Sequence, residues 1–147
     1  MYTTLEYVAS AFAAEQWAPG ALGAEPAEAA VLEWIEAAGA VLEGRIMGVV
    51  RVPVDPARSP RLHAVCAQIV GWRVRADVYD VLYKSHQDGD HRSRQSTVWR
   101  AEADRLLAEI LAGGIGDGVA ASDPAPGALG RAAGVFPEPA FRRGDRW

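Results

Sequence analysis

The apolar residues between Leu62 and Tyr83 constrain the fold of this chain more than any other feature. Apolar and aromatic side chains recur there at alternating steps of three and four residues: Leu62, Val65, Ile69, Trp72, Ala76, Tyr79 and Tyr83. This spacing places the whole set on one face of an α-helix. Ser59 and Pro60 stand immediately before the pattern, and helices favour these residues at the N-cap and in the first turn. The sequence therefore predicts a helix that begins at Pro60 and lies at the centre of the core.

A short helix is predicted near the N-terminus, from Thr4 to about Glu15. Thr3 and Glu6 have the spacing of a capping box, in which each side chain bonds the backbone N–H of the other residue. Three apolar residues fall on one face of this helix: Leu5, Val8 and Phe12. The Pro- and Gly-containing stretch 18–26 then ends the helical pattern.

A second helix is predicted to begin near Pro26. Its apolar residues also repeat with a helical period: Val31, Ile35, Ala38, Leu42, Ile46 and Val49. Gly39 and Gly44 each weaken this helix by up to about 1 kcal/mol relative to alanine. We expect these two glycines to permit close packing against a neighbouring helix. Residues 52–60 contain three prolines, so this segment is expected to be extended.

The fourth helix is predicted to begin after Ser96 and to run to about Ala112. The polar stretch 84–96 precedes it and is expected to form a loop, with Ser96 as the N-cap. Four apolar residues are predicted to face the core, namely Trp99, Ala103, Leu106 and Ile110. Three charged residues are predicted to face water, namely Glu102, Arg105 and Glu109. Gly113 and Gly114 are expected to stop the helix.

The composition of the chain changes after the fourth helix. Residues 113–134 are rich in Gly, Ala and Pro and have no sustained apolar period, which is typical of a linker. The chain has 147 residues, a length that suggests one domain. We therefore predict an all-α fold, in which residues 1–112 form a four-helix, antiparallel, bundle-like domain. Residues 113–147 are predicted to form a long extended C-terminal arm.

Charge and cysteine content exclude several classes of protein. A formal net charge of −4 argues against a general nucleic-acid coat, which needs clustered Lys and Arg. Cys66 is the one cysteine in the chain, so neither an intramolecular disulfide nor a cysteine-based zinc site is expected. No apolar run approaches the roughly 18 residues of a membrane span, and the N-terminal residues lack the pattern of a signal peptide. We expect a cytosolic protein without membrane contact, cofactor or bound metal.

Two groups of residues have the types that catalysis or metal binding would need. Residues 86–91, HQDGDH, contain two His and two Asp, which are ligands for divalent metals. Asp-Gly is also a common turn pair, and we favour a solvated turn. Cys66 and His63 lie three residues apart on one helix face, as a nucleophile and its base would. A buried cysteine is usually a small hydrophobic residue, and we favour that interpretation.

A third group suggests an alternative function. Arg92, Arg94 and Arg100 lie near the start of the fourth helix. They could contact phosphates, which would make the chain a small helical DNA-binding or regulatory domain. We favour a solvated basic face, because a group of this kind more often faces solvent than contacts nucleic acid.

The segment 135–147, VFPEPAFRRGDRW, does not have the composition of a solvated tail. Phe136, Phe141 and Trp147 each lose about 1.5–3 kcal/mol if they stay in water rather than in an apolar environment. Aromatic residues and arginine are also enriched at the energetic centres of protein interfaces. Two prolines extend the backbone in advance and so lower the entropy cost of binding. The segment is therefore expected to dock, either on its own helical domain or on another protein subunit.

Five segments of the chain resemble, in order, the small head–tail connector (adaptor, or head completion) proteins of tailed bacteriophages, specifically the Mu-type group of short helical virion proteins. The segments are MYTTLEYVASAF, AAGAVLEGRIMGVVRVPV, SPRLHAVCAQIVGWRVRADVY, VWRAEADRLLAEILAGG and VFPEPAFRRGDRW. They are similar to the short first helix of the family, its long helix with an extended continuation, its central helix, its last helix and its aromatic, basic C-terminal end. The resemblance covers nearly the whole chain.

This resemblance implies a structural virion protein and no enzymatic activity. Proteins of the family form a homo-oligomeric ring, here expected to have about twelve-fold symmetry, below the portal protein at one vertex of the capsid. The lower face of the ring receives the tail or a stopper or tail-terminator protein. Double-stranded DNA passes through the lumen without specific binding. The expected location is the head–tail neck of a phage or gene-transfer particle, which is assembled in the host bacterial cytoplasm.

The resemblance also implies which residues contact the portal. By position in the C-terminal segment, the anchors would be Phe136, Phe141, Arg142, Arg143 and Trp147. An acidic chain suits a conduit that must not hold passing DNA, because like charges repel phosphates. Three acidic residues of the second helix are candidates for the lining of the lumen: Glu33, Glu36 and Glu43.

Overall fold

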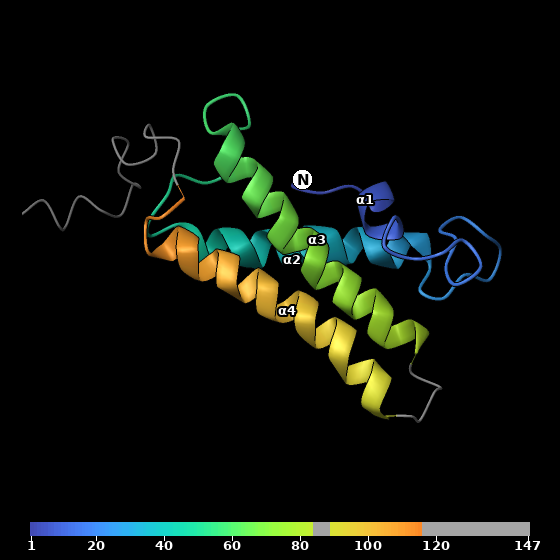
Figure 1. Cartoon of the computed structure of the whole chain (residues 1–147). Coiled ribbons are helices and arrows are strands. Elements are labelled where there is room, and N and C mark those ends of the chain that lie inside the picture. The colour runs from blue at the N-terminus through green and yellow to red at the C-terminus, as the bar shows by residue number, and fades with distance from the viewer. Residues whose placement is uncertain (84–88, 116–147) are drawn as a thin grey trace, which may run out of the picture.

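The computed structural model describes residues 1–83 and 89–115, except for the side chains of residues 89–94. Within these ranges the protein consists of helices that pack on one another, and it contains no β-strand. The helices are α1 (Leu5–Ala9), α2 (Glu28–Ile46), α3 (Pro60–Leu82) and α4 (Gly89–Leu111) (Figure 1). The prediction of an all-α fold is confirmed.

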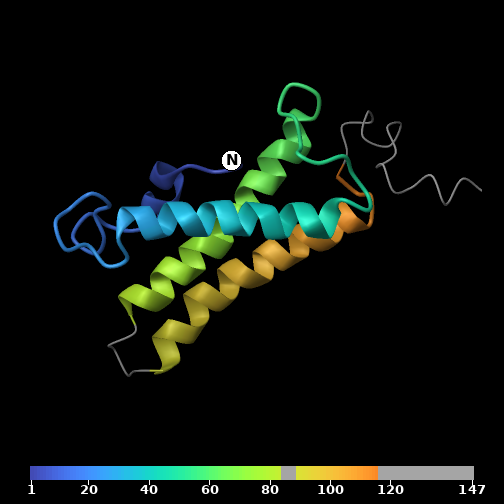
Figure 2. The same cartoon turned by 180° about the vertical axis from the view of Figure 1, so that it is seen from behind.

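Helix α3 lies at the centre of the molecule, as its apolar pattern predicts. It packs against each of the other three helices. Helix α4 runs antiparallel to α3, whereas α2 crosses α3 obliquely (Figures 1 and 2). The predicted stripe is only partly correct: Leu62, Ile69 and Ala76 are buried, whereas its other four members are half-buried, namely Val65, Trp72, Tyr79 and Tyr83. Because α3 is covered from several directions, further residues are buried outside the stripe: Cys66, Val70, Gly71, Val74 and Val78.

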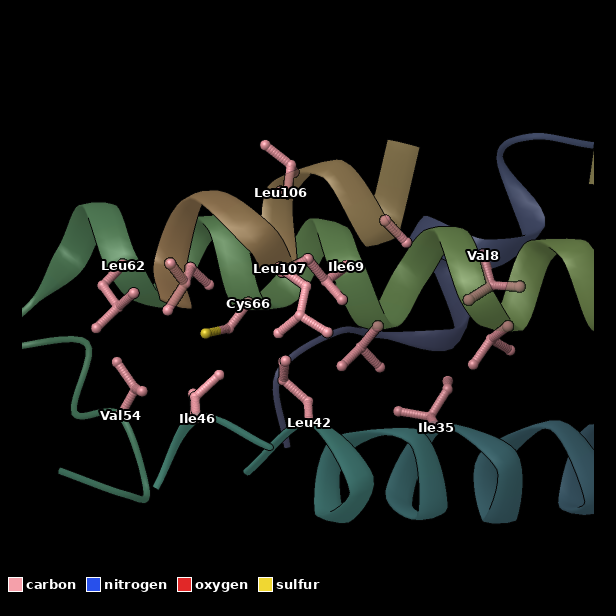
Figure 3. Close-up of a cluster of buried hydrophobic side chains, with 14 of the residues drawn as sticks. Val8, Ile35, Leu42, Ile46, Val54, Leu62, Cys66, Ile69, Leu106 and Leu107 are labelled. Carbon is pink, nitrogen blue, oxygen red and sulfur yellow. The ribbon is translucent and has the colours of Figure 1, made fainter. Parts of the chain in front are cut away.

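Part of the core lies where α2 meets α3, while the most extensive helix contact is between α3 and α4. Ile35, Leu42 and Ile46 of α2 point toward α3, and Cys66 and Ile69 of α3 point back toward them (Figure 3). All five side chains are at most 3% exposed to solvent. Burial of an aliphatic side chain of this size contributes about 1.5–3 kcal/mol to folding, so this interface accounts for much of the stability of the fold.

Helix α1 is shorter than predicted and begins one residue later than the proposed capping box. Thr4, and not Thr3, is its N-cap, and the Thr4 hydroxyl accepts a hydrogen bond from the backbone N–H of Tyr7 at 3.3 Å. Thr3 is buried instead. Phe12 lies beyond the end of α1, where its ring makes an edge-to-face contact with Trp17 at a centroid distance of 5.8 Å. Aromatic packing in the following loop therefore ends the helix early.

Helix α1 is held against α3 by one arginine and one glycine. The Arg75 guanidinium stacks over the Tyr7 ring at 3.9 Å and donates a hydrogen bond to the Tyr7 carbonyl oxygen. The same guanidinium donates a second hydrogen bond to the Ser10 hydroxyl at 3.0 Å. Gly71 lies under the Tyr7 ring, so close that a Cβ atom there would overlap the ring. The absence of a side chain at Gly71 is what lets α1 approach α3.

Helix α2 begins at Glu28, two residues after the predicted first-turn proline. Pro26 precedes the helix, and its carbonyl oxygen accepts a hydrogen bond from the buried Trp17 indole Nε1 at 2.9 Å. Gly39 is buried, and a Cβ atom there would make an ordinary 3.5 Å contact with the Tyr2 ring. A Cβ atom at Gly44 would meet nothing within 4 Å. The close-packing hypothesis is therefore wrong for Gly44, and at Gly39 the neighbour is a tyrosine ring and not a helix backbone.

Helix α4 begins at Gly89, so the predicted loop 84–96 is wrong over most of its length. Ser96 is buried inside α4 and is not its N-cap. Polar residues such as Arg, Gln and Ser differ from Leu in helix propensity by less than about 1 kcal/mol. A run of polar residues can therefore be either helix or loop. In this chain, packing on the central helix α3 favours the helix.

The predictions for the rest of α4 are confirmed in part. Ala103, Leu106 and Ile110 are buried, whereas Trp99 is half-buried and its ring makes edge-to-face contacts with those of Phe12 and Tyr79. The exposed Arg105 pairs along the helix with Glu102 at 2.9 Å and with Glu109. The helix ends in a Schellman motif, a left-handed turn that satisfies its last carbonyl groups. Two hydrogen bonds of 2.9 Å define the motif, from the backbone N–H of Gly113 to the carbonyl of Ile110 and from that of Gly114 to the carbonyl of Glu109.

The backbone φ of Gly113 is +75°, a value that favours glycine. Ile115 then packs against the core. The described residues therefore continue the helical packing up to Ile115, and the predicted domain boundary at residue 112 stays a prediction.

Candidate interaction surfaces

The predicted portal anchors lie outside the described residues. They are Phe136, Phe141, Arg142, Arg143 and Trp147, all within the segment 116–147.

An arginine-centred cluster of ion pairs joins α3 to α4. The Arg100 Nη2 atom lies 2.8 Å from Asp77 Oδ1 and 2.6 Å from Asp80 Oδ2. Asp77 and Asp80 are three residues apart and so lie on the same face of α3. The hydrogen bond to Asp77 is the main cause that raises the pKa of Arg100 above its ordinary value, and the hydrogen bond to Asp80 adds to it. Pairs this exposed contribute about 0.2–1 kcal/mol each, so the cluster sets the register of the two helices more than their stability.

The ion pairs of Arg100 weaken the nucleic-acid interpretation of the three arginines. A guanidinium that already has two carboxylate partners gains less from a phosphate, because binding must first break those contacts. The side chains of Arg92 and Arg94 lie outside the described residues. Asp77 and Asp80 were not singled out in the sequence, although their spacing of three residues was a usable signal.

A pocket opens between α2, α3 and α4, with a volume of about 330 Å³. Its apolar lining includes Trp34 and Val41 from α2 and Leu107 from α4. Two ion pairs lie at its polar side: the Arg100–Asp77 pair described above, and an Arg73–Asp104 pair at 2.6 Å. This pocket could not be predicted from the sequence, because its shape depends on the angle at which α2 crosses α3.

Several apolar residues are exposed in or directly after the C-terminal parts of α2 and α4. Helices α2 and α4 run toward the same end of the molecule and converge there (Figures 1 and 2). Val41 is 52% exposed, and Leu111, the last residue of α4, is 44% exposed. Met47 and Val49, which follow α2 directly, are 57% and 41% exposed. Exposed apolar groups gathered at one end of a small domain are typical of a surface that contacts another protein or chain segment.

One carboxylate oxygen of Glu43, a candidate for the lumen lining, is engaged within the chain. The Tyr2 hydroxyl donates a hydrogen bond to Glu43 Oε1 at 2.8 Å and accepts one from the backbone N–H of Val54 at 3.0 Å. Burial is the main cause that raises the pKa of Tyr2, and the contact with Glu43 adds to it. This network ties the N-terminus to α2 and to the segment that follows it. Glu33 and Glu36 are exposed on α2.

Cys66 and His63 do lie on the same side of α3, but their surroundings do not activate the thiol. Cys66 is fully buried in the core, and burial, with a smaller effect of Glu43, raises the pKa of its thiol to about 12. An activated thiol needs a lowered pKa. The His63 ring packs on Tyr2, with 5.3 Å between the ring centroids. The geometry supports the interpretation of Cys66 as a core residue.

The protonated state of Cys66 predicts a slow reaction with alkylating reagents. At pH 8, a pKa of about 12 instead of the ordinary 9.0 lowers the thiolate fraction by about a thousand-fold. Alkylation of the folded protein by iodoacetamide is therefore expected to be at least about a thousand-fold slower than in guanidinium, because burial also blocks access. The folded state holds this proton more tightly, so the free energy of unfolding should fall as the pH rises from about 9 toward 12. Native and denatured alkylation rates within ten-fold of each other would contradict the buried, protonated thiol.

The candidate metal ligands of residues 86–91 cannot be placed, since residues 84–88 and the side chains of 89–94 lie outside the described part. Among the described residues, no three His, Cys, Asp or Glu side chains gather in a way that could hold a metal ion. In the same residues, no helix combines the length and the apolar character needed to cross a membrane.

Comparisons with models of protein families, with curated proteins and with solved structures find no match for this chain.

Proposed function

We propose that this chain is a structural, non-enzymatic protein of the neck of a tailed phage or phage-like particle. In this proposal, copies of the chain form a ring between the portal and the tail or stopper protein. The C-terminal segment of each copy anchors the ring to the portal. The proposal starts from the resemblance of five segments, in order, to the head–tail connector family.

The observation that carries the proposal is the contrast between the helical unit and residues 135–147. In the described residues, α4 ends in its own cap and Ile115 packs against the core. Beyond it, two Phe, one Trp and three Arg are concentrated in thirteen residues. Such a segment has too few apolar residues to fold alone, and its composition matches the centres of protein interfaces. Repeating even a weak contact of this kind around a ring gives strong overall binding.

Two properties of the described surface support a role in assembly. Exposed apolar residues gather where α2 and α4 converge, which suits contact between neighbouring subunits. Glu33 and Glu36 are exposed on α2, and a ring that turned this face inward would present carboxylates to passing DNA. Like charge would then keep the phosphates mobile.

The test is to mix the purified chain with its cognate portal protein and to image the mixture by electron microscopy. We expect a ring of extra density beneath the portal. A chain that ends at Val119, and a full-length variant with Phe136→Ala, Phe141→Ala and Trp147→Ala, should both lose this density. The variant Glu33→Gln/Glu36→Gln is the matched control, because it changes exposed residues of the helical unit and should bind normally.

Other outcomes would change the proposal in defined ways. Density that survives in both C-terminal variants would keep the connector role but move the anchor to the helical unit. Bare portals with the intact chain would contradict the connector role. In that case, duplex DNA binding that weakens steeply with salt would favour the alternative of a small DNA-binding domain.

A further inference from the structure

The pocket between α2, α3 and α4 has the features of a binding site for a short chain segment. Trp34, Val41 and Leu107 give it apolar walls. Val41, in the C-terminal part of α2, is 52% exposed, so water reaches an apolar surface that a bound segment would cover. A volume of about 330 Å³ is enough for one or two large side chains.

The charged side chains that line the pocket could bind positively charged groups as well as negatively charged ones. Asp104 is 64% exposed, and its pair with Arg73 uses one of its two oxygen atoms, so the carboxylate can accept further hydrogen bonds. Asp77 is 50% exposed and pairs with Arg100 in the same manner. Arg45 also lines the pocket, and its exposed side chain makes no ion pair with the described residues.

We propose that this pocket binds residues 135–147 of the same chain. The aromatic residues of this segment match the apolar walls of the pocket. Arg142 and Arg143 match the free carboxylate oxygens of the lining, and the acidic residue Glu138 matches Arg45. Burial of one or two of the aromatic rings would offset their cost in water.

The position at which the chain leaves the helical unit favours this occupant. The chain continues from Ile115 at the end where α2 and α4 converge, and Arg45 and Leu107 line the pocket close to that end (Figure 2). Residues 116–134 can span up to about 60 Å when stretched, whereas α4 is about 34 Å long. A tethered segment also has an effective concentration in the millimolar range. Binding within one chain is therefore favoured over binding between chains at ordinary protein concentrations.

This docking is a property of the free protein and does not rest on the proposed portal role. If both hold, the pocket and the portal compete for the same residues. The segment would then have to leave the pocket before a ring could be anchored.

Cross-linking of the purified full-length chain tests the proposal. A cysteine is introduced into the segment by Ala140→Cys, which leaves all three aromatic residues in place, and a second into the pocket by Val41→Cys. The control chain carries Ala140→Cys with Val98→Cys. Val98 is also 52% exposed, but it does not line the pocket. Cys66 is fully buried and does not compete. Oxidised glutathione is the oxidant, and non-reducing electrophoresis measures the rate and size of the products.

We expect the Val41→Cys chain to form an intramolecular disulfide roughly ten-fold faster than the control, because docking raises the local concentration of the second thiol. Adding Phe136→Ala and Trp147→Ala to the same chain should reduce the rate to that of the control. Three results would overturn the proposal: equal rates at the two positions, a cross-linked dimer as the main product, or no effect of removing the aromatic residues.

Discussion

Replacing Ile69 by alanine is expected to lower the free energy of unfolding by about 2–5 kcal/mol. Ile69 is fully buried in the central helix α3 and points toward the core side chains of α2 (Figure 3). Because α3 is packed against every other helix, the surrounding structure has little freedom to close the cavity that the substitution leaves. A domain of this size is typically stable by about 5–15 kcal/mol, so this one change would remove a large share of the total.

Urea unfolding followed by far-ultraviolet circular dichroism measures this loss. Val98→Ala is the control, because Val98 is an aliphatic residue of α4 that is 52% exposed. Its change in unfolding free energy should stay within about 0.5 kcal/mol. If Ile69→Ala and Val98→Ala had equal effects, the placement of α3 at the centre of the core would be wrong.

Replacing Gly71 by alanine is the second change with a large expected effect, a loss of about 1–3 kcal/mol. A Cβ atom at Gly71 would lie 2.8 Å from Cδ1 of Tyr7, closer still to Cε1, and 3.4 Å from the Thr3 hydroxyl oxygen. The Tyr7 ring cannot move away freely, since the Arg75 guanidinium stacks on it. The added methyl group would therefore separate α1 from α3.

Gly44→Ala is the matched control, because it is the same substitution in the interior of another helix. No atom lies within 4 Å of a Cβ atom placed at Gly44. The substitution should therefore raise the free energy of unfolding by up to about 1 kcal/mol through helix propensity alone. Opposite signs at the two positions would support the contact of Tyr7 with α3, and a gain in stability at Gly71 would contradict it.

The sequence predicted the long helices well because their signals are local. The apolar period of residues 62–83 predicted α3, and Pro60 marked its first residue as the structure has it. Gly113 and Gly114 likewise predicted the end of α4. The positive φ that ends this helix occurs at Gly113 alone, and a glycine at that position is a local sequence signal. At Ser59 the position was predicted correctly, but its side chain makes no capping hydrogen bond.

The errors arose where a distant residue decides the local structure. Ser96 has the residue type of an N-cap, but packing of α4 along α3 carries the helix past it. Nothing in the sequence singled out Gly71. Only the folded structure shows that the Tyr7 ring lies where a side chain at this position would be. The partners of Arg100 lie 20 and 23 residues earlier in the chain, a pairing that the composition of α4 cannot reveal.

For the proposed docking contact, the sequence predicted the kind of residues in the segment but not the surface that would bind them. The aromatic and basic composition of residues 135–147 predicts a docking segment, but no feature of the segment itself says which surface would receive it. The pocket that we assign to it combines residues from three helices. It becomes visible only when the crossing of α2 over α3 is known.

The cap at Gly113 and the contact of Ile115 with the core have a consequence for how such a protein can evolve. Both contacts are made by described residues, and they fix the position and direction of the chain at Ile115. Insertions or deletions in residues 116–134 can then tune the reach of the segment while the helical packing stays the same. Doubling the length of this connection would cost only about 0.6 kcal/mol in closure entropy, and halving it would raise the effective concentration about three-fold. Reach and fold stability are thus two traits that selection, or an engineer, can adjust separately.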